Sequence, residues 1–251
     1  MKKVKVEFKN IVKKFNETTA VDNISCHFEP GTLTTLLGPS GCGKTTSLRL
    51  IAGLERATSG NILIDNEDVT ITPATDRDVS MVFQSYALFP HMSVLENVSY
   101  GLKMINVKKI EYVEKSIDTL KLVGLENYEN RMPSELSGGQ QQRVAVARAI
   151  VLEPKVLLFD EPLSNLDAKL RRQVREDIRS IQQKLAVTTI YVTHDQEEAL
   201  AISDKVIVMN NAIIAQQGTP KELYSAPKTK FVANFIGDSN IIKVKIDDHN
   251  D

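Results

Sequence analysis

The sequence Gly38-Pro39-Ser40-Gly41-Cys42-Gly43-Lys44-Thr45-Thr46 matches the phosphate-loop pattern G-x-x-x-x-G-K-[ST] at every fixed position. Before it, residues 32–37 form an apolar, β-branched run that predicts a short strand. After it, residues 45–52 carry apolar side chains at helical spacing, which predicts a helix. A strand, a glycine-rich loop and a helix in this order are the context that the pattern requires. This stretch therefore predicts an α/β fold built around a phosphate-binding loop.

The residue types of this loop suit a nucleoside triphosphate. Its glycines let the backbone turn tightly and approach a phosphate, and the helix start presents N–H groups to an anion. Lys44 adds a full charge, worth roughly 4 kcal/mol against a phosphate oxygen at about 4 Å and an effective dielectric near 20. The Thr45 hydroxyl is placed to bind Mg²⁺, and Thr46 to bond a phosphate oxygen. The loop alone leaves a kinase, a GTPase, a helicase and a transport motor open.

The 251 residues are 42% hydrophobic and 25% charged, which is ordinary for a soluble globular protein. The net charge of −1 gives no field that favours nucleic acid or an anionic membrane. The sequence has no run of about 18 apolar residues and no signal-peptide core at its start, so we expect a cytosolic chain without a membrane span. Cys26 and Cys42 lack the spacing of a metal site.

Alternating apolar residues predict strands near residues 4–8, 24–28 and 59–66. Residues 79–83 form a short apolar run, which we interpret as a buried strand. Phe15 lies in a polar stretch after the first strand. Its ring either belongs to the core or stacks on a flat ligand, and the neighbouring residues do not decide between these interpretations.

Residues 90–135 show helical patterns and no strand signal. Ser93 and Glu96 form a capping box that starts one helix. A second helix is predicted from an apolar face that ends before Gly124 and contains Ile110, Val113, Ile117 and Leu120. We interpret this stretch as a helical subdomain inserted into the α/β domain.

The pentapeptide Leu136-Ser137-Gly138-Gly139-Gln140 places two glycines at the start of a further helix. Ser137 is its predicted cap. Such a helix start is a second anion-binding end, and a plain glycine-rich cap is the alternative.

Polar side chains follow three of the predicted strands, where α/β proteins bind their ligands. Asp160 and Glu161 end the apolar run 156–159; Asp160 can hold Mg²⁺ through water, and Glu161 can orient and deprotonate an attacking water. His194 follows the β-rich run 188–192, where it can meet a γ-phosphate and the water. Gln84 follows residues 79–83, and its amide can bind Mg²⁺ or position water.

The second half of the chain alternates helices and strands. Asp167 is a natural cap for a helix, and Asp195 with Glu198 caps another. The remaining predicted elements are the hairpin 205–216, a helix from Pro220, a helix over 231–236 and a strand over 242–246.

In this order, the motifs resemble those of ATP-binding-cassette (ABC) ATPases over about residues 3–236. The pentapeptide 136–140 is the specific part, because other phosphate-loop families lack it. The resemblance implies an α/β phosphate-loop ABC ATPase fold, with a RecA-like core, an antiparallel β subdomain and an inserted α-helical subdomain. It implies an ATPase domain over 1–236, with the helical subdomain at about 90–152. Residues 237–251 are then the start or remnant of a C-terminal β regulatory domain.

The resemblance also implies a role for each matching residue. Residues 38–45 resemble the Walker A loop, and residues 137–140 resemble the signature that clasps the γ-phosphate of ATP held by another subunit. The implied single-residue roles are adenine stacking for Phe15, the Q-loop for Gln84, Walker B for Asp160, the catalytic glutamate for Glu161 and the switch histidine for His194. Asn165 stands where this family more commonly has alanine after the serine. This departure leaves the timing of communication between the subunits open.

ATP and Mg²⁺ are thus the implied cofactors, and the implied assembly is a head-to-tail homodimer with two ATP molecules at its interface. Residues 84–93, 138–143, 156–167 and 191–199 resemble importers that take cargo from an extracytoplasmic binding protein. Such a chain is peripheral at the cytoplasmic face of the membrane, contacts integral permease subunits and binds no nucleic acid. Gln84 and the helices after it then form a groove for a permease helix, with apolar contacts from Tyr86, Leu88, Phe89 and Met92.

Within that group the chain most resembles the ATPases of ferric-iron importers. Importers of polyamines, phosphonates or sugars remain alternatives, because the ATPase does not touch the cargo. From a different class, a soluble ABC ATPase scaffold, such as one for iron–sulfur assembly, would show partners without membrane spans. A DNA-repair ATPase of this class would carry a long coiled coil between the phosphate loop and residues 136–140, where this chain has a compact helical segment.

Overall fold

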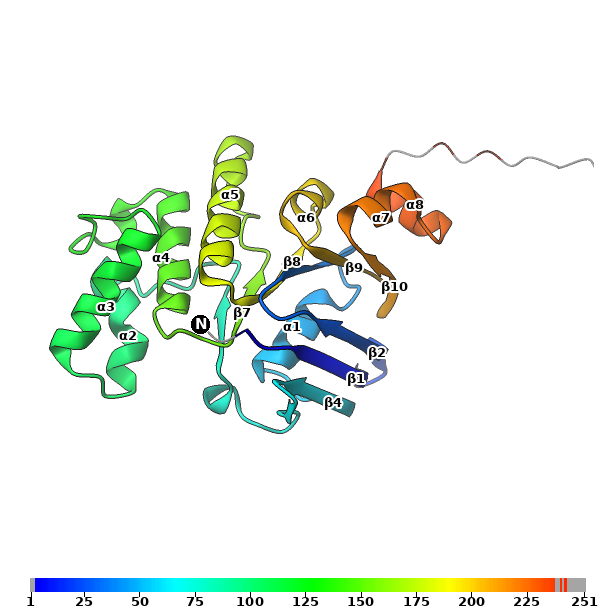
Figure 1. The fold of residues 1–251 in the computed structure, drawn as a ribbon, viewed down its shortest axis with the longest axis horizontal. Coiled ribbons are helices and arrows are strands. Elements are labelled where there is room, and N and C mark those ends of the chain that lie inside the picture. Colours follow the sequence, from blue (N-terminus) through cyan, green and yellow to red (C-terminus); the bar gives the residue numbers. More distant parts are fainter. Residues whose placement is uncertain (1–2, 238–239, 241, 243–251) are drawn as a thin grey trace, which may run out of the picture.

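A computed structural model describes residues 3–237, 240 and 242. Its centre is a six-stranded sheet in the order β10-β9-β3-β8-β7-β6 (Figure 1). Five strands are parallel, and β10 pairs antiparallel with β9. The bounds are β3 Leu33–Leu37, β6 Val79–Val82, β7 Val156–Asp160, β8 Thr188–Thr193, β9 Lys205–Asn210 and β10 Ile213–Gly218. The carboxyl ends of the parallel strands, which precede all the predicted catalytic residues, therefore lie at one edge.

A second, antiparallel sheet has the order β2-β1-β4-β5, with β1 Val6–Phe15, β2 Thr18–Phe28, β4 Ser59–Ile64 and β5 Glu67–Asp68. Helix α1 (Lys44–Ala52) packs between the two sheets, as Figure 1 shows. Its Leu48 and Ile51 share one buried cluster with Phe8 and Phe28 of the antiparallel sheet and Leu158 of β7. The phosphate loop is thus followed by a helix that packs against both sheets.

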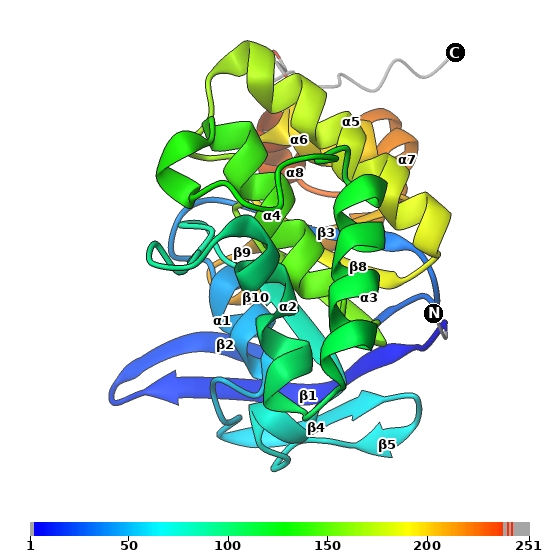
Figure 2. The ribbon, with the colours of Figure 1, turned by 90° about the vertical axis from the view of Figure 1, so that its left-hand side faces the viewer.

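The remaining helices form two groups. Helices α2 (Val94–Met104), α3 (Lys109–Leu122) and α4 (Gly138–Ile150) lie together at one side, and a turn of 3-10 helix at Pro133–Glu135 precedes α4 (Figures 1 and 2). Helix α5 (Ala168–Leu185) joins them to the central sheet through a shared core. Helices α6 (Gln196–Ile202), α7 (Pro220–Ser225) and α8 (Lys230–Ile236) pack beside β9 through a third cluster.

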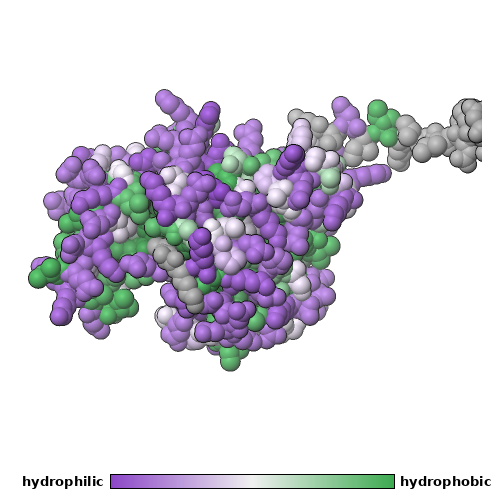
Figure 3. Space-filling model, viewed as in Figure 1, coloured by the Kyte–Doolittle hydropathy of each residue, from purple (hydrophilic) through white to green (hydrophobic). Residues whose placement is uncertain are grey.

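Most predicted elements are confirmed, and two details are wrong. Residues 79–82 form an edge strand and not a buried one, since only Val82 is buried and the other three are half-buried. In α3, Leu120 is buried but Ile110 is 84% exposed, so the predicted apolar face does not pack as a whole. Figure 3 shows hydrophobic side chains exposed over α2 and α3. The strand predicted over 242–246 lies outside the described residues except for Ile242.

Within the part of the chain that the structure describes, no helix is both long enough and apolar enough to span a bilayer.

Candidate nucleotide-binding site

The phosphate loop connects β3 to α1 and closes over neighbouring backbone. Gly43 caps α1 with a φ of 102°, which is a left-handed conformation that favours glycine. A Cβ on Gly43 would lie 2.3 Å from the Ala20 carbonyl oxygen, and one on Gly38 would lie 2.3 Å from that of Met209. Close packing therefore requires glycine at both positions, and Gly43 is required by its conformation as well.

Lys44 lies inside the loop that it follows. Its side chain is buried, and Nζ donates hydrogen bonds to the carbonyl oxygens of Gly38 (2.8 Å) and Pro39 (2.9 Å). Cys42 Sγ is 3.8 Å from the same ammonium, and burial raises the pKa of its thiol. The positive charge thus lies at the centre of the loop, where no described carboxylate pairs with it and where it can bind an anion.

Thr45 and Asp160 meet although they are far apart in the sequence. The Thr45 hydroxyl donates to Asp160 Oδ1 at 2.9 Å, across the ends of β3 and β7. Asp160 is only 8% exposed, and burial raises the pKa of its carboxyl even though the Thr45 bond opposes this. A hydroxyl and a carboxylate are hard oxygen ligands. The pair fits Mg²⁺, which takes few protein ligands and completes its shell with phosphate and water.

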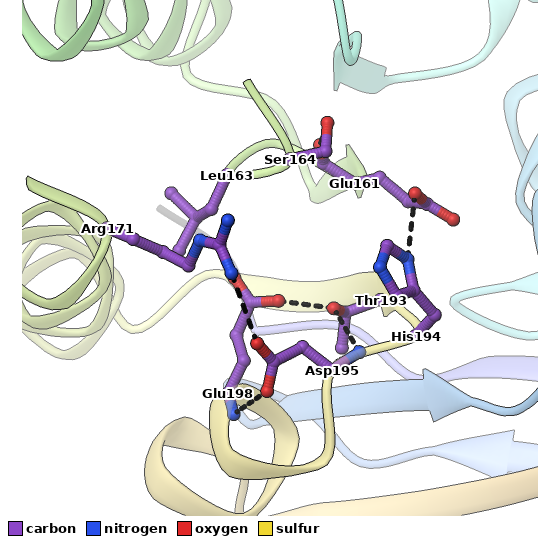
Figure 4. Close-up of a pocket in the computed structure, with 8 residues that line it drawn as sticks. All are labelled: Glu161, Leu163, Ser164, Arg171, Thr193, His194, Asp195 and Glu198. Atoms are coloured by element: carbon purple, nitrogen blue, oxygen red, sulfur yellow. Dashed lines mark hydrogen bonds and ion pairs between the residues drawn. The ribbon is translucent and has the colours of Figure 1, made fainter. Parts of the chain in front are cut away.

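Glu161 and His194 form the exposed half of the site (Figure 4). His194 Nδ1 lies 3.1 Å from Glu161 Oε2, and the backbone N–H of Glu161 donates to the Val192 carbonyl at 3.0 Å. Glu161 adopts a left-handed φ of 45°, an uncommon conformation for a non-glycine residue. The two neighbouring strands β7 and β8 therefore deliver a carboxylate and an imidazole to one point.

A buried carboxyl supports the turn that carries His194. Glu198 is 3% exposed and accepts hydrogen bonds from the hydroxyls of Tyr191 and Thr193. Burial raises the pKa of the Glu198 carboxyl, and the hydrogen bonds from Thr193 and Tyr191 oppose this shift. Asp195 caps α6 as predicted, because its Oδ1 accepts a hydrogen bond from the Glu198 N–H at 3.0 Å. The predicted second half of the cap is wrong, since the Glu198 side chain turns inward and does not complete a capping box. Burying its carboxyl beside two hydroxyls satisfies both carboxyl oxygens at once.

Gln84 begins the loop after β6, and its side chain is exposed. Its backbone carbonyl accepts a hydrogen bond from the Asn165 side chain at 3.0 Å. Farther along, Tyr86 and Ala87 both have positive φ, and Arg148 donates to both of their carbonyls, at 2.9 and 2.8 Å. No sequence pattern predicts Arg148 as a partner of this loop, because its acceptors are backbone atoms of a distant segment.

Phe15 and the pentapeptide make only local polar contacts in the part of the chain that the structure describes. Phe15 ends β1 with its ring 42% exposed and Lys13 Nζ 4.4 Å from the ring centroid, so the core interpretation is wrong. Ser137 caps α4 by accepting from the Gln140 N–H, and Gly139 packs closely on Leu170. Among the described residues, no hydrogen bond or ion pair joins residues 137–140 to the phosphate loop.

A groove of about 400 Å³ lies between the end of β6 and the helices α2 and α4. Phe89 lines it, as predicted, but Tyr86 is buried in the core and leaves no side chain for a partner. The other large side chains that line the groove are Met81, Phe83, Tyr100, Arg148 and Leu152.

Residues 21–164 match the family model described as ABC transporter. The chain belongs to the ABC transporter family. This ABC ATPase is 62% identical over 96% of its length to the Fe(3+) ions import ATP-binding protein FbpC of Agrobacterium fabrum, covering 68% of that relative. It is 57% identical over 97% of its length to the protein of the same description from Photobacterium profundum, covering 69% of it.

Solved structures confirm the predicted ABC ATPase fold. The cbiO1 structure from Clostridium perfringens, described as part of the ABC transporter complex cbiONQ, superimposes with a TM-score of 0.81 at 30% identity, covering 87% of this chain and 89% of that one. The ABC cassette MJ0796, as a dimer in a post-hydrolysis state bound to ADP and Pi, gives a TM-score of 0.74 at 30% identity, covering 86% and 98%. As an ABC ATPase, the chain binds and hydrolyses ATP.

Proposed function

We propose that this chain is the ATP-hydrolysing subunit of an importer that carries Fe(3+) across the cytoplasmic membrane. The similarity to FbpC proteins over nearly the whole chain supports the cargo. The observation that carries the proposal is the joint position of Thr45 with Asp160 and of Glu161 with His194 at the ends of three neighbouring strands. This arrangement can hold a triphosphate and direct a water at it.

Each residue then has one task in hydrolysis. The loop 38–46 and Lys44 bind the phosphates, and Phe15 stacks on the adenine. Thr45, Asp160 and Gln84 hold Mg²⁺, which supplies charge neutralisation when bound. Glu161 accepts a proton from the attacking water, and His194 holds the Glu161 carboxylate in place.

The pentapeptide 137–140 completes the site from a second copy of the chain. Among the described residues, no hydrogen bond or ion pair joins the pentapeptide to the phosphate loop of the same chain, and this supports the assignment. A helix N-terminus with two glycines can bind an anion that a second copy presents. A symmetric dimer makes two equivalent sites, and ATP closes it by binding the closed state better than the open one.

The same proposal covers the rest of the assembly. The groove beside Phe89 receives a helix of a permease subunit, the chain lies at the cytoplasmic face of the membrane, and an extracytoplasmic binding protein acts through the permease. Residues 1–236 form the ATPase domain, with a helical subdomain at about 90–152. Residues 237–251, which we predict to be the start or remnant of a C-terminal β regulatory domain, lie outside the described residues except for 237, 240 and 242.

Uptake of iron by vesicles tests this function. Vesicles that hold this chain and the permease encoded by the neighbouring genes should accumulate radioactive Fe(3+) only with internal Mg-ATP. Glu161→Gln is the control: it should keep ATP binding but slow hydrolysis by roughly 10²- to 10⁴-fold and stop uptake. Uptake of a polyamine, a phosphonate or a sugar in place of iron would contradict the assignment of Fe(3+) as the cargo. Uptake in vesicles that lack the chain would contradict its role as the ATPase that drives transport.

A further inference from the structure

One short segment, residues 163–167, contacts two of the loops that carry predicted catalytic residues. On one side, Asn165 Nδ2 donates to the Gln84 carbonyl oxygen at 3.0 Å. These two residues lie 81 positions apart, on the loops that leave the adjacent parallel strands β6 and β7. The Asn165 side chain is therefore the contact between the segment and the start of the loop after β6.

On the other side, Arg171 of α5 bridges the segment to the turn after β8. Its Nη2 donates to the Leu166 carbonyl at 3.1 Å, and its Nη1 lies 3.5 Å from Asp195 Oδ2. Figure 4 shows the guanidinium reaching Asp195, the residue that follows His194. Asp195 also caps α6 by accepting a hydrogen bond from the Glu198 N–H, so Arg171 contacts a residue that is fixed in the turn after β8.

The segment between these contacts is braced internally. The Ser164 hydroxyl donates to the Glu161 carbonyl at 3.0 Å, and the Leu166 N–H donates to the Leu163 carbonyl at 3.1 Å. Leu163 and Leu166 are 1% and 6% exposed, and Asp167 caps α5. These bonds and the buried leucines connect the two ends of the segment through fixed contacts within the chain.

We propose that Asn165 and Arg171 are positioning residues that couple the loop of Gln84 to the turn of His194 through residues 163–167. A change in the Gln84 loop is then transmitted to Asp195 and His194, and so to the Glu161 carboxylate. The proposal rests on the proposed function for the roles of Gln84, Glu161 and His194. The coupling itself is a property of the chain and is testable without ATP.

Hydrogen exchange on the full chain without nucleotide tests the coupling. The reporters are amides bonded in each loop: Phe89 N–H to Asn97 Oδ1 at 2.8 Å in one, and Asp195 N–H to the Thr193 hydroxyl at 3.0 Å in the other. Arg171→Ala should speed exchange in residues 83–92, which Arg171 does not touch in any described contact. Asn165→Ala should speed exchange in residues 193–198. We expect about threefold to tenfold, the ratio for loss of one hydrogen bond.

Matched variants separate coupling from general loosening. Asn61→Ala removes a comparable exposed bond, to Asp68 at 2.8 Å, and Arg172→Ala removes the neighbouring arginine, which pairs with Glu176 at 3.4 Å. Both should leave the two reporters unchanged. If Arg171→Ala affects only residues 193–198 and Asn165→Ala only residues 83–92, each bond is local and the coupling is wrong.

Kinetics supply the second readout. Asn165→Ala should lower kcat for ATP by a similar factor and leave KM unchanged, because nucleotide binding does not use Asn165. Arg171→Lys keeps a cation near Asp195 and should restore part of the effect, which also serves if Arg171→Ala fails to fold. Unchanged kcat in both variants would overturn the positioning role. A wild-type chain without ATPase activity would overturn the proposed function instead, and the exchange experiment would still decide the coupling.

Discussion

At the scale of single residues, the site keeps a carboxylate where burial penalises its charge. Asp160 is nearly enclosed at the end of β7, and burial raises its pKa above the ordinary value of 3.8. A raised pKa means that the folded state binds the proton more tightly than the unfolded state. The contribution of Asp160 to stability is therefore present below pH 3.8 and is lost as the pH rises through the folded-state pKa.

Asp160→Asn should thus stabilise the protein while disabling it. The amide oxygen can still accept from Thr45, but it carries no charge to bury. The melting temperature of the variant should exceed that of the wild type near neutral pH, with the difference shrinking towards acid pH. ATP hydrolysis should be lost, because a ligand for Mg²⁺ is removed.

Thermal melting between acid and neutral pH checks this, with Asp22→Asn as a control on the exposed face of β2. The control should leave the melting temperature nearly unchanged, because the Asp22 side chain is exposed. A variant with Asn at 160 that melts lower at every pH would show that the carboxylate is stabilising and that burial is not the dominant effect.

At the scale of elements, the helix behind the phosphate loop is held at its far end by an arginine. Arg77 is 6% exposed and donates to the last carbonyls of α1, Leu50 at 2.6 Å and Ile51 at 2.9 Å. Its Nε donates to Thr72 at 2.9 Å. A cation at a helix C-terminus satisfies carbonyls that have no partner within the helix and interacts favourably with the dipole.

Arg77→Ala should lower the free energy of unfolding by about 3 kcal/mol, because several buried carbonyls lose their donor. Denaturant unfolding measures this. Arg172→Ala, which removes an exposed pair within α5, should cost less than about 0.5 kcal/mol. Equal costs for the two variants would mean that Arg77 contributes no more than a surface arginine.

At the scale of the whole molecule, the phosphate loop and the pentapeptide belong to different layers. The first lies between the two sheets, and the second starts α4 in the helical group. A composite site made from two copies predicts complementation. Lys44→Ala and Ser137→Arg should each be inactive alone, since each damages both sites of its dimer.

Mixing the two inactive variants in equal amounts should restore about a quarter of the wild-type ATPase rate. Half of the random dimers are mixed, and each mixed dimer holds one site with an intact lysine and an intact serine. Steady-state hydrolysis checks this, and Ser137→Arg alone should still bind ATP. No recovery on mixing, from variants that still form dimers, would contradict the composite site.

The sequence by itself determined the class of fold, the order of the elements and the motif residues. Residues 38–46 and the apolar runs before Asp160 and His194 are local patterns, and local patterns predict strands, helices and caps well. Local patterns cannot show whether a strand is central or at an edge, so the apolar run 79–83 predicts a buried strand where the structure has an edge strand over residues 79–82. They also cannot show whether Phe15 faces the core.

Only the tertiary structure decided which groups meet. The contacts of Thr45 with Asp160, of Asn165 with the Gln84 carbonyl and of Arg171 with Asp195 join segments that are distant in the chain. The acceptor of Asn165 is a backbone carbonyl, which every residue possesses, so the sequence carries no mark of it. Such pairings depend on how the strands are arranged in space, and a pattern along the chain does not contain that arrangement.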